Sequence, residues 1–149
     1  MTNSDWLTHI PTLRYLALRR VRKLSDLTPV TRLRALQWLW LETLTVDRLP
    51  DFRSSTMLTR ADCLGMRHLR HPAALQGLAA APQLRELLVA APHLPVDAVV
   101  PFVGHPTLER AEIVLGSHQR DRDVDDLLRL PPPRPDRQFA AMHALTRVL

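Results

Sequence analysis

Four residues near the middle of the chain have side chains that can do covalent or metal chemistry: Asp62, Cys63, His68 and His71. A cysteine beside a histidine can act as an activated nucleophile, and cysteine, histidine and carboxylate side chains are the usual ligands of zinc. Cys63, however, falls at an apolar position of a recurring pattern, and a buried cysteine generally behaves as a small hydrophobic side chain. We therefore expect no catalytic residue, no metal and no cofactor, and we predict that the protein is not an enzyme.

Other kinds of site also lack sequence support. The single cysteine excludes an internal disulfide, and the four glycines are too scattered to form a phosphate-binding loop. No segment approaches the roughly 20 apolar residues of a membrane-spanning helix, and the first residues lack the features of an export signal. We expect a cytoplasmic protein that does not bind a membrane.

A second group of residues, aromatic and charged, points to binding instead of catalysis. Trp38 and Trp40 lie two positions apart, and Tyr15, Arg19 and Arg60 occur at related positions of the same recurring pattern. Tryptophan, tyrosine and arginine are enriched among the residues that dominate protein–protein binding. These side chains predict a surface that binds a partner protein, provided that the fold brings them together.

The elements that must position these side chains are short apolar units. A unit has apolar residues at its first, fourth and sixth positions, as in Leu36-Gln-Trp-Leu39-Trp-Leu41. Five units can be aligned, at residues 13–18, 36–41, 58–63, 84–89 and 108–113, and their starts are separated by 23, 22, 26 and 24 residues. The change of spacing from three to two within a unit is expected where the chain becomes extended and its side chains alternate.

These units resemble leucine-rich repeats, which have a period of about 20–29 residues, and the piece from Leu24 to Val30 resembles the short bacterial, internalin-like subtype. The resemblance covers residues 7–116. It implies an α/β leucine-rich repeat solenoid, with short parallel strands on a concave face and turns with short 3₁₀ or α-helices on a convex face. The third unit is the least regular, with Ala61 and Cys63 at apolar positions. The buried asparagine of the family is replaced here, so we expect less uniform turns; the residues at its position are Val21, Leu44, Met66, Pro92 and Gly116.

The sequence divides into an array and a tail. We expect a repeat array over residues 1–118, a capping helix over 119–130, a proline-rich linker over 131–137 and a terminal helix over 138–149. In the capping helix, Leu127, Leu128 and Leu130 should face inward. Three prolines at 131–133 favour an extended segment, which we interpret as a spacer in preference to a ligand for a proline-recognising domain. The segments around 73–80 and 96–103 are long enough for short helices on the convex side.

The beginning of the chain leaves two alternatives. No capping helix precedes Trp6, although the ends of solenoids need one. Either Trp6 and its neighbours form a minimal lid, or the chain is the C-terminal part of a longer array that lacks its N-terminal cap, which we favour. An uncapped first unit would expose apolar residues and promote self-association; these are Leu7, Ile10 and Leu13.

If the units are parallel strands, the apolar positions face the core and the residues between them face the concave surface. Trp40 and Asp62 then occupy the same position in successive units, which we call a column, and the remaining residues come from the neighbouring columns. We predict that the partner-binding residues are Tyr15, Trp38, Trp40, Arg19, Arg60, Asp62, Glu86 and Arg110. Two alternatives stay open: a register shifted by one residue would bury both tryptophans, or the C-terminal tail would cover the rings.

The favoured function is a non-catalytic protein–protein interaction module, which in a larger bacterial protein would form its C-terminal sensing part. A small regulatory or immunity-type protein that inhibits an enzyme by wrapping it is the alternative. Nucleic-acid binding is a second, less favoured alternative, because acidic residues are expected on the same face as the basic ones. It would use the net charge of +5 and the basic cluster Arg14, Arg19, Arg20, Arg22 and Lys23.

Overall fold

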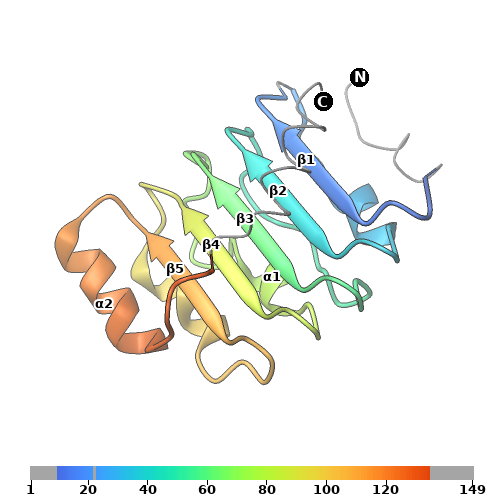
Figure 1. Ribbon diagram of the computed structural model, residues 1–149. Helices are drawn as coiled ribbons and strands as arrows, with labels where there is room; N and C mark the ends of the chain where they lie inside the picture. The colour runs from blue at the N-terminus through green and yellow to red at the C-terminus, as the bar shows by residue number, and fades with distance from the viewer. Residues whose placement is uncertain (1–9, 22, 135–149) are drawn as a thin grey trace.

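A five-stranded, all-parallel sheet organises the protein in the computed structural model, which describes residues 10–21 and 23–134 (Figure 1). The strands follow one another across the sheet in the order of the sequence, β1-β2-β3-β4-β5. Each strand has five residues: β1 Tyr15–Arg19, β2 Trp38–Glu42, β3 Arg60–Leu64, β4 Glu86–Ala90 and β5 Arg110–Val114. The predicted α/β character and parallel strands are therefore confirmed.

Short helices in the segments between the strands lie behind the sheet in Figure 1. They are the 3₁₀ helix η2 Thr28–Arg32, the α-helix α1 Gln76–Ala79 and the 3₁₀ helix η3 Val96–Phe102. Parallel strands need such crossover segments, because a tight hairpin can join only antiparallel ones. The two helices expected around residues 73–80 and 96–103 are confirmed as α1 and η3.

The core fills the space between the sheet and these crossover segments. Side chains alternate along each strand, so that every second one is buried in the core. The strand residues that belong to this core are Leu16, Leu18, Leu39, Leu41, Ala61, Cys63, Leu87, Val89, Ala111 and Ile113. Phe52 and Phe102 complete the core from the crossover side. The least regular unit thus keeps the predicted register.

Hydroxyl and imidazole groups tie successive crossover segments together, in the absence of an asparagine series. Thr107 Oγ1 donates to the carbonyl of Leu84 at 2.7 Å, and Thr59 Oγ1 donates to the carbonyl of Gln37 at 3.2 Å. His105 Nε2 lies 3.1 Å from the carbonyl oxygen of Ala79, which belongs to the preceding crossover segment. The expected lack of uniformity among the turns stays a prediction.

The helix α2, His118–Leu128, packs beside β5 and η3 at the end of the sheet (Figure 1). Its inward contact comes from Val124, which is buried, and from Leu128 one turn later. The expectation that Leu127 faces inward is wrong, since its side chain is 40% exposed. Neighbouring helical residues point about 100° apart, so a helix placed by Val124 and Leu128 turns Leu127 towards solvent. Leu130 packs against the core from beyond the end of the helix.

Some expectations fall on residues that the structure does not describe. The terminal helix expected over 138–149 and the lid expected around Trp6 lie outside the described residues. Within residues 10–21 and 23–134, none of the helices has the length and apolar composition needed to cross a membrane.

Candidate functional site

The outer face of the sheet is the face turned away from the crossover helices (Figure 1). The first residues of the five strands lie side by side on this face, because all four strand pairs share the same register. We call these residues the cross-strand row: Tyr15, Trp38, Arg60, Glu86 and Arg110. All five were predicted as binding residues, and the structure brings them into one line across the sheet.

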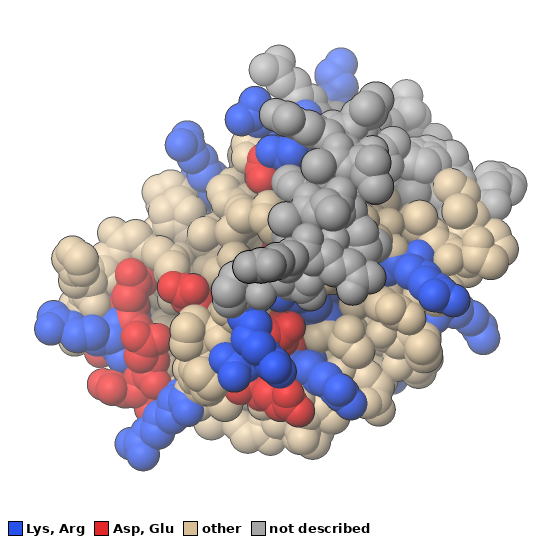
Figure 2. All heavy atoms as spheres, viewed as in Figure 1, with Lys and Arg blue, Asp and Glu red and all other residues tan. Residues whose placement is uncertain are grey.

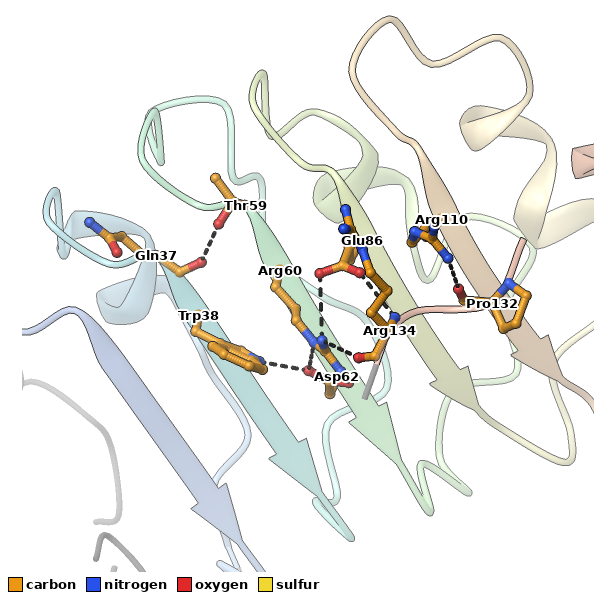
Figure 3. A network of polar contacts seen from close by, with 9 residues as sticks. All are labelled: Gln37, Trp38, Thr59, Arg60, Asp62, Glu86, Arg110, Pro132 and Arg134. Carbon is orange, nitrogen blue, oxygen red and sulfur yellow. Dashed lines mark hydrogen bonds and ion pairs between the residues drawn. The ribbon is translucent and has the colours of Figure 1, made fainter. Parts of the chain in front are cut away.

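Asp62 holds the middle of the row together. Its Oδ2 accepts a hydrogen bond from Trp38 Nε1 at 2.8 Å and another from Arg60 Nε at 3.1 Å, as Figure 3 shows. The Arg60 guanidinium also lies over the Trp38 ring, with its carbon 4.6 Å from the ring centroid. Such a cation–π contact adds to the ion pair and fixes the orientation of the indole.

Burial makes Asp62 a supporting residue of this face. Its exposed fraction is 0%, although we expected it to be available at the surface. Burial raises the pKa of Asp62, and hydrogen bonds from Trp38 and Arg60 act in the opposite direction. The position of a residue within its unit predicts which face of the sheet its side chain points to, but not which groups pack over it. For this reason Asp62 was expected to be exposed.

The three aromatic side chains differ in exposure. Trp38 and Trp40 are half-buried and lie on the outer face, so the register is the predicted one and not the shifted alternative. The expectation of an exposed Tyr15 is wrong, since its exposed fraction is 5%. Its ring meets Trp38 edge to face, with the ring centroids 6.1 Å apart. Tyr15 therefore supports one side of the Trp38 indole, and Arg60 lies over the ring.

A second cluster joins Arg19 and Trp40 through Glu42. The Arg19 guanidinium lies 3.1 Å from Glu42 Oε2, and Trp40 Nε1 donates to Glu42 Oε1 at 3.2 Å. Glu42 was not among the predicted binding residues. Its position pairs with that of Arg19 on the neighbouring strand, so the opposite charges at one position of successive units were the signal that could have identified it.

The C-terminal strap, residues 131–134, lies on the outer face and follows the row from β5 towards β3 (Figure 3). The Ala111 N–H donates to the carbonyl of Pro131 at 2.9 Å, and Arg110 donates to the carbonyl of Pro132 at 3.1 Å. The strap is therefore hydrogen-bonded to the sheet, which a simple spacer between two elements would not need.

Arg134 continues the strap over the middle of the sheet. Its N–H donates to Glu86 Oε1 at 3.1 Å, and its carbonyl accepts from Arg60 Nη1 at 3.1 Å. Arg60 and Glu86 are also paired with each other at 3.5 Å. Arg60 on β3 thus supplies a donor, and Glu86 on β4 supplies an acceptor, to the main chain of Arg134.

Charges of both signs mingle on this face of the molecule. In Figure 2, basic and acidic side chains of the described residues lie next to one another over the later strands and α2. A surface of this kind offers matched pairs of donors and acceptors and not a uniformly positive field.

Of the residues first considered for chemistry, Asp62 supports this face, whereas Cys63 and His71 take no part in the contacts described on it. The Cys63 side chain is 0% exposed, and burial, with the nearby Asp62 charge, raises the pKa of its thiol. His71 Nδ1 accepts the N–H of Ala73 at 3.0 Å within a turn. Among the described residues, no cluster of three or more histidine, cysteine or acidic side chains could hold a metal ion. Comparisons of the chain with protein-family models, with curated proteins and with solved structures find no match.

Proposed function

We propose that the chain forms a leucine-rich repeat solenoid and works in the cytoplasm as a non-catalytic protein-interaction module. The outer face of β1 to β5 would bind a partner protein. The sequential order of the strands, their common register and the spacing of the buried leucines support the repeat architecture.

The observation that carries the binding function is the way in which the two tryptophans are held. Trp38 is fixed by Asp62, Arg60 and Tyr15, and Trp40 is bonded to Glu42. Rings that are already ordered lose little conformational freedom when a partner covers them, so more of their contact energy is available for affinity. Aromatic and arginine side chains held in this way suit a protein interface.

A protein partner fits the charges of this face better than a nucleic acid. Arg19 and Arg60 are each paired with a carboxylate, so phosphate groups would have to compete with Glu42 and Asp62 for them. Acidic side chains on the same face would repel the phosphate backbone. The charge pairs can instead exchange hydrogen bonds with the polar groups of a protein.

The test begins with the tagged chain, which is used to capture partners from an extract of the source cells. A captured protein is purified, and its affinity for the wild-type chain and for Trp40→Ala is measured by calorimetry. Trp40 is chosen because its hydrogen bond goes to the partly exposed Glu42 and not to the buried Asp62. Loss of a binding hot spot should weaken the complex by about 30-fold or more.

The control removes apolar surface elsewhere. Val100 and Val103 are exposed at and beside η3, so Val100→Ala with Val103→Ala should leave the affinity unchanged. A partner that loses affinity in the valine variant and not in Trp40→Ala would place binding outside the outer face and contradict the proposal.

A further inference from the structure

The strap is held to the sheet through its backbone, by three residues of the cross-strand row and by Ala111 beside it. The carbonyls of Pro131, Pro132 and Arg134 accept hydrogen bonds, and the N–H of Arg134 donates one. Their partners on the sheet are Ala111, Arg110, Arg60 and Glu86. Contacts to backbone atoms do not depend on the identity of the side chains, so the same surface can hold another segment that has the same conformation.

That conformation is set by proline. Leu130, Pro131, Pro132 and Arg134 each precede a proline in the sequence, and a residue before proline is biased towards extended backbone. A polyproline segment advances about 3.1 Å per residue, and neighbouring strands lie about 4.8 Å apart. Two residues of the strap therefore cover more than one strand spacing, which matches its step from Arg110 on β5 at Pro132 to Glu86 on β4 at Arg134.

The row also has an aromatic end. Beyond Arg60 it continues to the half-buried Trp38, whose ring the buried Tyr15 supports. Arg60 links the two halves because it contacts both the Trp38 ring and the Arg134 carbonyl. Aromatic side chains beside hydrogen-bond donors are the features by which several unrelated domains bind extended proline-rich peptides. Figure 3 shows Trp38 and the contacts of the strap on the same face.

We propose that the cross-strand row is a binding site for an extended, proline-rich peptide of a partner protein, and that the strap occupies this site until the peptide displaces it. The inference rests on the proposed function and names the partner's chemistry. The bound peptide has the pattern Pro-Pro-Pro-X, in which X is any residue except proline. Glu86 Oε1 accepts the N–H of Arg134, and proline has no N–H to offer at that position.

Tethering gives the strap an advantage over a free peptide. A segment joined to its site by a short connection acts at an effective concentration in the millimolar range. A free peptide must exceed that concentration, or bind more tightly than the strap does, in order to displace it. Loosening the strap should therefore make peptide binding measurable. Replacing Pro131, Pro132 and Pro133 with glycine keeps the carbonyls but increases the freedom of the unbound segment.

The probe is a synthetic peptide Leu-Pro-Pro-Pro-Arg-Pro, which copies residues 130–135. It is titrated into the wild-type chain and into the full-length Pro131→Gly, Pro132→Gly, Pro133→Gly variant, and binding is followed by calorimetry. We expect affinity for the loosened variant to be at least about tenfold higher than for the wild type. In the loosened variant, Glu86→Gln should lower the affinity by about tenfold, because a charged acceptor is lost.

Two matched controls separate recognition from general charge effects. Glu112 is an exposed carboxylate on β5, and Glu112→Gln in the loosened variant should leave peptide affinity unchanged. A peptide with proline in place of its arginine should bind less well, since it lacks the N–H for Glu86. Equal affinity of the two peptides, equal affinity of the wild-type and loosened chains, or equal losses in the two glutamine variants would overturn the inference.

A measurement on the unaltered chain guards against misfolding of the glycine variant. In the wild type, saturating peptide should accelerate hydrogen exchange at the Arg134 amide, because the strap leaves Glu86; unchanged exchange at saturation would contradict displacement. The outcome also separates this inference from the proposed function. A partner protein that depends on Trp40 but is not displaced by the peptide would support the proposed function and overturn the proline-rich site.

Discussion

Asp62 connects the stability of the protein to the order of its outer face. Its carboxylate is fully buried, yet it accepts hydrogen bonds from Trp38 and Arg60. A buried charge is costly unless it is paired and hydrogen-bonded. The arrangement therefore keeps an ionisable group in the interior in order to hold two side chains of the binding surface in place.

The pH dependence of unfolding should report this burial. Because burial raises the folded-state pKa of Asp62 above its usual value of 3.8, the folded protein binds a proton at this site more readily than the unfolded chain does. The resulting stability is fully present below the usual pKa, which the unfolded chain keeps, and is lost as pH rises through the higher folded-state pKa. Asp62→Asn removes this contribution. The free energy of unfolding of the wild type, relative to Asp62→Asn, should therefore fall as pH rises through this window.

Urea unfolding of both proteins at about pH 3, 5 and 7 measures that difference. Glu112→Gln is the control, because it removes an exposed carboxylate from the same face. A wild type that gains stability relative to Asp62→Asn as pH rises would show that the hydrogen bonds from Trp38 and Arg60 outweigh the effect of burial.

Arg120 ties the helix α2 to the turns that follow β4 and β5. The Arg120 guanidinium donates to the carbonyls of Leu94 and Pro92, each at 2.9 Å, and to the carbonyl of Leu115. These carbonyls belong to the turns around β4 and β5, so a single side chain satisfies three backbone acceptors from two parts of the chain. A planar guanidinium can reach several acceptors in this way, whereas an apolar side chain can reach none.

Arg120→Met should lower the free energy of unfolding by about 2–3 kcal/mol, since carbonyls that lose a charged donor are left to water or remain unsatisfied. For a domain of this size, the melting temperature should fall by about 4–10 °C. Arg122→Met is the matched control on the same helix, where the side chain is exposed and donates to Gln119 Oε1 at 3.3 Å. Equal melting temperatures of the two variants would mean that Arg120 does not anchor α2.

The elements show where sequence patterns succeed and where they stop. Regular spacing fixed the direction of Leu39 and Leu41 in advance, because alternation along a strand depends only on the backbone. The same rule left Leu127 misplaced, since its direction depends on how α2 docks against β5 and η3. The burial of Tyr15 and Asp62 was missed for the same reason. The position in a unit predicts which face a side chain points to, whereas its exposure depends on the tertiary packing around it.

At the scale of the whole molecule, the sheet is built from contacts between successive strands. Within the described residues, strand–strand packing joins β1 with β2, β2 with β3, β3 with β4 and β4 with β5. The strap is an exception in sequence distance, because it connects Arg134 with Arg60, 74 positions earlier. The proline run was evident in the sequence, but its docking was not, since its backbone contacts leave no pattern in the side chains.

Because each strand packs against its neighbours in the sheet, we predict that a destabilising substitution in an edge strand loosens only the strands near it. Leu16 in β1 and Leu87 in β4 are both buried, with β1 at the edge of the sheet and β4 inside it. Replacing a buried leucine with alanine costs about 2–5 kcal/mol. In Leu16→Ala, hydrogen exchange should accelerate in β1 and β2, while β4 and β5 keep their protection, because partial opening at one end leaves the other end packed. In Leu87→Ala, exchange should accelerate in β3, β4 and β5 together. If Leu16→Ala instead accelerated exchange equally in all five strands, the sheet would unfold as one cooperative unit, and the strap from β5 to β3 would be the first contact to examine as its cause.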